Sequence, residues 1–200
     1  MYADEKIRTE IYKQLKEKSL DDLNVRMICD GAGVKRQTFY YYYKDLLGAI
    51  RSELGPKYID CMGDSASAQT WSIGLLKTLR FVKEHADIVN HLYFSSSKDQ
   101  ILKDIETYAS QVFAIHVHDL AVQHHYKLRI TDEDFLVQFY VTTFISMICS
   151  FIEKGMVENP DTLVLRMVTV MEGSILRSMK ALEKIDSNMK VNQYNECNLA

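Results

Sequence analysis

The stretch from Ile28 to Lys44 reads ICDGAGVKRQTFYYYYK and decides the fold of the chain. Gly31 and Gly33 stand in its first half, and glycine readily supplies the positive φ of a tight turn. Asn24 can cap the short helix before this turn, because its side chain can accept from free backbone N–H groups. Another short helix is expected from about residue 35 to residue 42. The stretch therefore predicts two short helices joined by a glycine turn.

A third helix precedes this pair. Ile7, Ile11 and Leu15 recur about one helical turn apart, which marks one apolar face of a helix over residues 4–18. Three helices joined by short turns in the first quarter of the chain form a helix-turn-helix layout.

The remainder of the chain also has the apolar spacing of helices. Two prolines and eight glycines punctuate 200 residues, which disfavours a β-sandwich or barrel because these folds need frequent turns. Gly55-Pro56 is expected to interrupt or re-aim the fourth helix. The sequence predicts an all-α protein of about nine helices. The further segments expected to be helical are 45–55, 71–84, 87–94, 98–128, 132–155 and 160–185.

The segment between Gly31 and Lys44 has the chemistry of a nucleic-acid surface. It contains no acid, three bases and four consecutive tyrosines. Bases neutralise phosphates and release counterions, whereas Arg and Gln can pair with the edges of guanine and adenine. Tyrosine hydroxyls can donate to phosphate oxygens without adding charge. Arg36, Gln37 and Tyr41 are expected near bases, and Tyr40, Tyr42 and Lys44 near phosphates.

The same segment resembles the DNA-reading motif of TetR-type repressors. GV at Gly33, TFY at Thr38 and the aromatic Tyr43 fit a pattern that reads A-G-V-S-x-x-T-(L/F)-Y-x-(H/Y)-F. The wording RQTFYY is closest to a subset of that family. A second stretch, from FYV at Phe139 to IEKGM at Met156, resembles the penultimate helix of many members. The resemblance implies a helical fold and a transcription regulator that binds DNA, by family default a repressor.

The resemblance also implies which residues lie at or beside DNA. These are Asn24, Lys35, Arg36, Gln37, Thr38, Tyr40, Tyr41, Tyr42 and Lys44. The chain departs from the family pattern at Lys35, which replaces Ser, at Tyr43, which replaces Phe, and at Phe151, which replaces Trp. Lys44-Asp45-Leu46-Leu47 abbreviates the usual Lys-acid-x-Leu, so two alignments of Lys44 with the family lysine stay open.

A homodimer is expected on both the resemblance and the residues. In the family the last two helices form a four-helix bundle with a second copy. The helix over 132–155 is apolar on nearly every side, so it needs cover on all faces. A two-fold dimer can place two recognition helices in successive major grooves, about 34–36 Å apart or further. The expected interface residues are Phe139, Ile148, Phe151, Met167, Val170, Met171, Ser174 and Ser178.

The middle of the chain is where the family houses an effector pocket. Aromatic side chains with a few polar groups suit a mostly apolar ligand. The residues expected in this pocket are Trp71, His91, Tyr108, Phe113, His116, Tyr140 and Phe144. Two alternatives stay open: these are core residues without a natural ligand, or control runs through a protein co-activator. One subset of the family, including the activator of dihydroxyacetone kinase operons, uses such a co-activator.

Composition excludes several other classes. A content of 47% hydrophobic and 26% charged residues is globular rather than disordered. The net charge is −3, but bases outnumber acids in residues 1–57 and acids outnumber bases in the remainder. None of the four cysteines forms a CxxC motif, the histidines lack metal-ligand spacing, and no nucleophile stands beside a base. We therefore expect no metal, no cofactor and no enzymatic activity.

The expected organisation is a DNA-binding domain over 1–54, an effector-binding and dimerisation domain over 55–185, and a disordered tail over 186–200. The charged N-terminus lacks the apolar core of a signal peptide, and no long charge-free apolar stretch predicts a membrane span. A cytoplasmic protein is expected. The rival class is a helical protein-interaction module that does not bind DNA.

Overall fold

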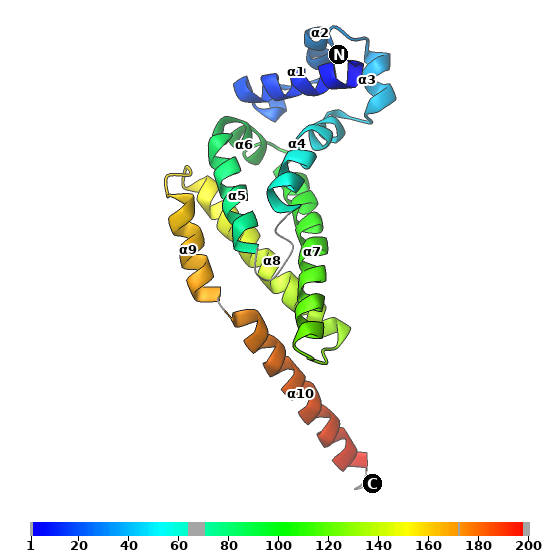
Figure 1. Cartoon of the computed structure of the whole chain (residues 1–200). Helices are drawn as coiled ribbons and strands as arrows, with labels where there is room; N and C mark the ends of the chain where they lie inside the picture. Colours follow the sequence, from blue (N-terminus) through cyan, green and yellow to red (C-terminus); the bar gives the residue numbers. More distant parts are fainter. Residues whose placement is uncertain (1, 64–70, 172, 198–200) are drawn as a thin grey trace.

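The computed structural model describes the backbone of residues 2–63, 71–171 and 173–197, with the side chains of 2–55, 71–171 and 173–185. Every regular element in these ranges is helical, which confirms the all-α prediction. Figure 1 shows α1 to α3 gathered at one end and α10 leading away from the other. The helices are α1 (Ala3–Glu17), α2 (Val25–Ala32), α3 (Arg36–Tyr42), α4 (Leu46–Gly63), α5 (Trp71–Glu84), α6 (Ala86–Tyr93), α7 (Lys98–Gln123), α8 (Ile130–Glu153), α9 (Pro160–Met171) and α10 (Ser174–Cys197), with a 3₁₀ turn at Leu20–Asp22.

The head, which we define as α1 to α3, folds around one apolar cluster. Ile7, Ile11 and Leu15 are fully buried, as their spacing predicts, and Phe39 of α3 is buried with them. The cluster continues into α4 and α6, because Ile88 belongs to it as well. The head is therefore attached to the rest of the molecule by shared core packing.

Helix α4 does not stop at Gly55-Pro56, where an interruption was expected. It runs without a break from Leu46 to Gly63. A proline normally clashes with the Cβ of the residue before it, and Gly55 has no Cβ. This absence removes one of the clashes that disfavour a helix before proline, and the interruption expected at Gly55-Pro56 does not occur.

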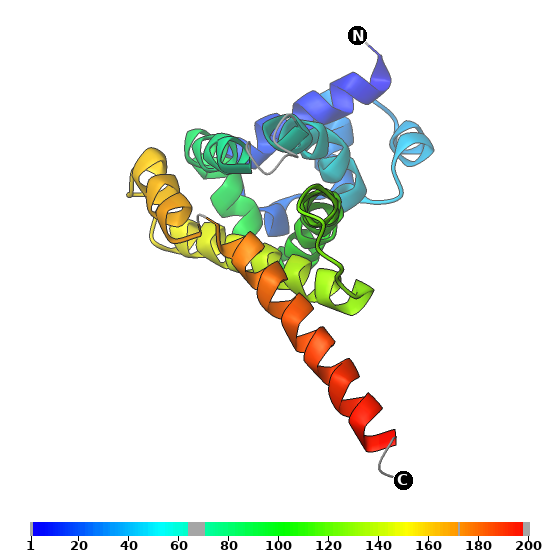
Figure 2. The same ribbon diagram turned by 60° about the horizontal axis from the view of Figure 1, so that its bottom comes forward.

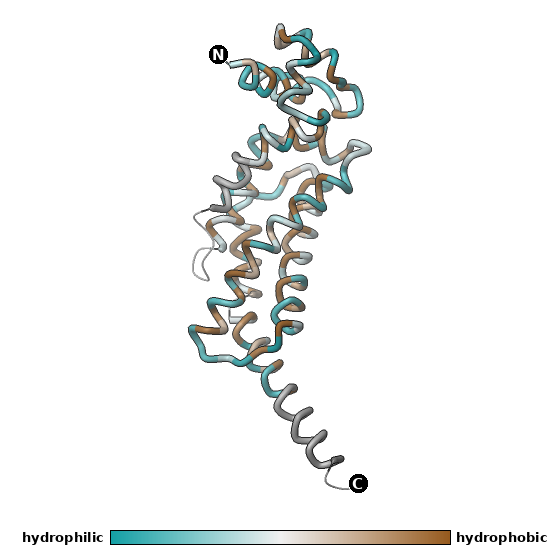
Figure 3. The backbone as a smooth tube through the Cα atoms, turned by 90° about the vertical axis from the view of Figure 1, so that its right-hand side faces the viewer, coloured by the Kyte–Doolittle hydropathy of each residue, from teal (hydrophilic) through white to brown (hydrophobic). Residues whose placement is uncertain are grey.

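Helices α5 to α10 form the body. Two apolar clusters hold it together, one around α5, α8 and α9 and the other around α7, α8 and α10. Helix α8 contributes to both, and apolar residues recur along most of the body helices (Figure 3). Within the described residues α8 is also the one helix long and apolar enough to cross a membrane, although 33% of that stretch is buried within the molecule. Such a helix is weak support for a span, because the core helix of a soluble protein meets the same criteria.

The C-terminal segment differs from the single helix expected over 160–185. Gly173 adopts a left-handed conformation with φ of 65°, which ends the path of α9 and starts α10 in a new direction. Helix α10 then continues to Cys197 and leads away from the body, as Figure 2 shows. The tail expected to fray from residue 186 is thus helical to Cys197, since no proline or glycine stands there to end the helix.

Polar contacts also join head and body. Nδ1 of His91 lies 2.7 Å from the carbonyl oxygen of Leu15 in α1. The carboxylate of Asp21 accepts from the backbone N–H of Ser96 at 3.0 Å and from its hydroxyl at 2.7 Å. These contacts place α6 and the loop after it directly against the head.

Candidate nucleic-acid interface and candidate effector cavity

The turn between α2 and α3 has the geometry that its sequence predicts. The Asn24 side chain accepts from the backbone N–H of Met27 at 3.1 Å and so caps α2. Gly33 is left-handed with φ of 65°, a conformation that costs other residues energy. Gly31 lies so close to α1 that an added Cβ would collide with the Glu10 carboxyl group. The two glycines therefore set both the turn and the distance between α1 and α2.

Helix α3 has one buried anchor and a continuous exposed face. Phe39 is fully buried, whereas Tyr41 is 81% exposed. Of the predicted DNA residues, Thr38 is half-buried and the remainder are exposed. The exposed residues are Asn24, Lys35, Arg36, Gln37, Tyr40, Tyr41, Tyr42 and Lys44. The structure thus brings the predicted residues together on the surface of the helix-turn-helix unit.

Tyr43, the fourth tyrosine, has a different place. Its ring is buried and packs 5.6 Å from the Phe39 ring, centroid to centroid. Its hydroxyl donates to the Asp4 carboxylate, and burial together with this carboxylate raises the pKa of Tyr43 to about 12. Tyr43 therefore fastens the end of α3 to the start of α1 and stays neutral.

The exposed face can bind a nucleic-acid backbone and read bases. Lys35, Arg36 and Lys44 supply positive charge, and no acid lies on α3 itself. Gln37 and Arg36 lie in the first turn of the helix, where side chains of a recognition helix contact base edges. The exposed tyrosine hydroxyls add donors for phosphate oxygens.

A cavity of about 610 Å³ lies between head and body. This size is within the range of small-molecule sites, about 300–1,000 Å³. Helices α1, α4, α5, α6, α7 and α8 all contribute to its walls. Just over half of its lining side chains are Leu, Ile or Val. The charged residues of the described lining are Arg51, Lys98 and Asp104.

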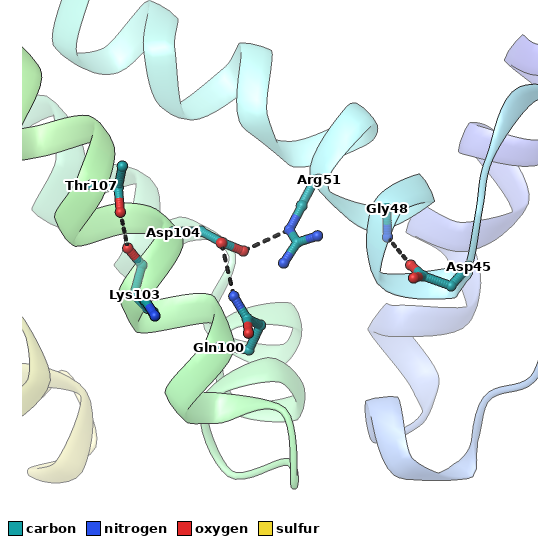
Figure 4. A network of polar contacts seen from close by, with 7 residues as sticks. All are labelled: Asp45, Gly48, Arg51, Gln100, Lys103, Asp104 and Thr107. Carbon is teal, nitrogen blue, oxygen red and sulfur yellow. Dashed lines mark hydrogen bonds and ion pairs between the residues drawn. The ribbon is translucent and has the colours of Figure 1, made fainter.

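Two groups of polar contacts flank this cavity. The Tyr93 hydroxyl donates to Glu153 at 2.6 Å, and Lys98 lies 3.6 Å from the same carboxylate. Burial, followed by the bond to Glu153, raises the pKa of Tyr93, so it remains a neutral donor. Nε of Arg51 in α4 donates to Asp104 in α7 at 2.6 Å, and Asp104 also accepts from Gln100 at 3.1 Å (Figure 4).

Tyr108 lines this cavity as predicted for the pocket, but the other six expected pocket residues do not. Phe113, Tyr140 and Phe144 pack ring against ring between α7 and α8, where they fill space instead of enclosing it. Trp71 packs on Phe144 at 5.3 Å. Six of the seven expected residues thus lie outside this cavity, because aromatic spacing alone cannot separate a packed cluster from a cavity wall.

The two histidines expected in the pocket are placed elsewhere. His91 contacts α1 at the junction of head and body. His116 is buried beside Phe113, and burial lowers its pKa, which favours the neutral ring. No group of three His, Cys, Asp or Glu side chains in the described part of the chain could hold a metal ion.

The expected interface residues fall into three groups. Phe139 is 55% exposed and Val170 is 77% exposed, so both are available to a second copy. Phe151 and Met167 are buried in the core between α5, α8 and α9, which corrects their assignment to an interface. The half-buried residues are Ile148, Met171, Ser174 and Ser178. Ser174 accepts from the Tyr140 hydroxyl at 2.9 Å within the same chain.

Sequence reasoning missed most of the cavity wall. Tyr12, Leu47, Ile50 and Arg51 belong to α1 and α4, which the sequence assigned to DNA binding. Their signal was ordinary apolar helix spacing, which does not reveal whether a side chain faces packed core or open space.

Comparisons with known proteins agree with this architecture. The sequence profile of a TetR C-terminal family, described as "Transcriptional regulator C-terminal region", matches residues 69–173. No curated protein matches the chain. Among solved structures, the dihydroxyacetone kinase operon activator DhaS is similar, with a TM-score of 0.59 and 14% identity over 90% of this chain and 98% of that one. A TetR-family transcriptional regulator from Streptomyces coelicolor has a TM-score of 0.55 and 14% identity over 91% of this chain and 86% of that one. At these identities the structural likeness shows the fold alone.

Proposed function

Because the chain belongs to the TetR family of transcriptional regulators, we propose that it is a homodimeric regulator that binds an operator sequence and senses an effector. Membership of the family makes the chain a transcriptional regulator. Base reading, dimerisation and effector sensing by this chain are what we propose in addition. We also assign it to the subset with RQTFYY in the recognition helix, to the cytoplasm and to the non-enzymatic proteins.

The exposed face of α3 is the observation that carries DNA binding. In this proposal α3 enters the major groove, where Arg36, Gln37 and Tyr41 contact base edges. Tyr40, Tyr42 and Lys44 then contact phosphates, and Lys35 and Thr38 lie beside them. Asn24 places the N-terminus of α2 near the DNA backbone. Phe39 and Tyr43 support the helix from behind, since both are buried.

The dimer is proposed to form through the outer faces of α8 and the C-terminal helices. Phe135 and Phe139 are both more than half exposed, and their rings stack 6.4 Å apart. Val170 on α9 is exposed as well. Exposed apolar side chains at the surface of a helical body are typical of an interface between subunits. We retain Phe139, Val170, Met171 and Ser178 as interface residues.

The effector site is proposed to be the cavity between head and body. A ligand that binds one arrangement of the head better than another shifts the population toward it. A difference of about 1.4 kcal/mol between the two arrangements changes operator affinity tenfold. By family default the protein is a repressor. The domain division at residue 54 is kept as a proposal, with the cavity spanning the two sides of it.

Control by a protein co-activator is the second candidate. Ile115, Val122 and Ile130 are exposed apolar residues at the α7–α8 end of the body. Such a surface would suit a partner protein, and the similar DhaS is named as an activator. This candidate predicts that α7–α8 surface substitutions abolish regulation while cavity substitutions do not.

Footprinting on the DNA upstream of the protein's own gene tests the proposed function. The wild-type protein should protect a defined site, with an affinity that falls steeply as salt rises. A protein-interaction module without DNA binding would protect no site and would show no salt dependence. Loss of all sequence preference in this region would contradict the proposal.

A further inference from the structure

The ion pair between Arg51 and Asp104 lies where the cavity lining meets solvent. Both residues line the cavity, and their side chains are 45% and 36% exposed. Arg51 belongs to α4, which packs mainly on α1 and α5, whereas Asp104 belongs to α7. The pair therefore links the helix that supports the head to the far wall of the cavity, as Figure 4 shows.

The guanidinium of Arg51 has unused donors. Asp104 accepts from Nε, and neither terminal Nη group has a hydrogen-bond partner among the described residues. The paired Nη groups of arginine match the two oxygens of a carboxylate. By contrast, Lys98 is engaged with Glu153 and lies 3.8 Å from the centroid of the Tyr93 ring. Arg51 is thus the cation of the lining best placed to bind an anion.

The walls behind Arg51 favour an aliphatic guest. Leu47, Ile50, Ile101 and Ile105 line the cavity next to this residue along α4 and α7. Burial of each methylene group of a ligand among these side chains removes apolar surface from water and so adds to its affinity. Among the charged side chains of the described lining, Lys98 is paired with Glu153, whereas the open Nη groups of Arg51 offer one site for a single negative charge.

Building on the effector site proposed above, we propose that the cavity binds an aliphatic monocarboxylate whose carboxylate takes the Nη groups of Arg51. The hydrocarbon chain lies among the Leu, Ile and Val side chains. The ligand carboxylate binds the guanidinium beside Asp104, and repulsion between the two carboxylates weakens the link between α4 and α7. Arg51 is then both the ligand anchor and the connection to the head.

Calorimetric titration of the full chain with monomeric sodium dodecanoate and with dodecanol tests the ligand assignment. Dodecanoate should bind more tightly than dodecanol. Arg51→Gln should weaken dodecanoate binding about tenfold and leave dodecanol binding within about twofold. Asp104→Asn should tighten dodecanoate binding, because it removes the carboxylate that repels the ligand without changing the shape of the wall.

Arg80→Gln is the matched control. Arg80 forms an ion pair of the same length, 2.6 Å, with Asp161 between α5 and α9, outside the cavity lining. This variant should bind both ligands as the wild type does. Absence of dodecanoate binding, or equal loss in Arg51→Gln and Arg80→Gln, would overturn the assignment.

A second readout tests the connection to the head. On the footprinted DNA, Asp104→Asn without ligand should change affinity in the same direction as dodecanoate does in the wild type. An unchanged affinity in this variant, where dodecanoate alters the wild type, would overturn the proposed weakening of the Arg51–Asp104 link. Failure of DNA binding itself would remove the proposed regulator function but leave the calorimetric result intact, so the two failures can be told apart.

Discussion

Helix α3 and the cavity are the two regions of this molecule for which we propose a function, and they are built in opposite ways. The side chains proposed to contact DNA come from one short segment and its turn, and nearly all of them are exposed. The residues that line the cavity come from α1 and from α4 to α8, and they lie between Tyr12 and Ile152 in the sequence. A locally encoded surface needs correct folding of the head, whereas the cavity depends on how head and body pack together.

The position of the cavity relative to α3 determines how a bound ligand can affect DNA binding. No described residue of α3 lines the cavity, but its walls include α1, which belongs to the head, and α4, which shares core packing with it. Occupation of the cavity can therefore bias the position of the head while leaving the DNA-facing residues unchanged. Allosteric coupling of this kind is reciprocal, so DNA should change ligand affinity by the same factor.

The largest effect is expected from the buried anchor of α3. Phe39→Ala should destabilise the head by about 3–5 kcal/mol, because it removes a fully buried ring. Tyr41→Ala is the matched control on the same helix and should alter stability by less than about 0.5 kcal/mol. Urea unfolding measures both. Equal stability of the two variants would mean that α3 is not held by its buried face.

The next effect concerns the body surface. Phe139→Asp should weaken the dimer by about 2–4 kcal/mol if this exposed ring is a central contact. Phe94→Asp, at a ring that follows α6 and is 65% exposed, should leave the dimer intact. Sedimentation equilibrium reports the dissociation constant of each. A Phe139→Asp dimer as tight as the wild type would remove α8 from the interface.

A smaller effect separates base reading from phosphate binding on α3. Gln37→Ala should cost about 1–3 kcal/mol at the preferred DNA site and little on other sequences. Lys44→Gln should weaken binding to all sequences alike and lower the salt slope by about one. Fluorescence anisotropy at several salt concentrations distinguishes them. A uniform loss in Gln37→Ala would show that Gln37 does not read bases.

The smallest effect is expected in the cavity. Ile105→Phe should raise stability by about 0.5–1 kcal/mol, since the added ring enters open space, and should exclude dodecanoate. Ile115→Phe on the same helix points to solvent and should change neither property. Thermal unfolding with and without ligand compares them. Destabilisation by Ile105→Phe would argue that this wall is already packed.

The surface of α3 could be predicted from the sequence, whereas the cavity could not. The turn, the cap at Asn24 and the exposed face of α3 follow from short-range rules, because glycine conformation and residue spacing act within a few residues. The same rules placed the apolar faces of most helices. They failed at Gly55-Pro56, where α4 continues past the proline, and at Gly173, where a left-handed glycine divides the last helix.

The cavity could not be predicted in the same way. Phe113 and Tyr140 have the aromatic character of a pocket lining, yet they fill space between two helices. Ile105 and Arg51 have ordinary surface-helix patterns, yet both face the cavity. Which apolar face meets a void depends on contacts between residues far apart in the chain, and a single sequence does not state those contacts.

Selection of binding sites from random double-stranded DNA tests the central claim most directly. The account predicts enrichment of one palindromic sequence, with half-sites about one helical turn or a multiple apart, because two copies of α3 read the same bases. The Gln37→Ala variant should lose preference at one position of each half-site. Recovery of DNA with no common sequence, at any salt concentration, would contradict the claim that α3 reads an operator.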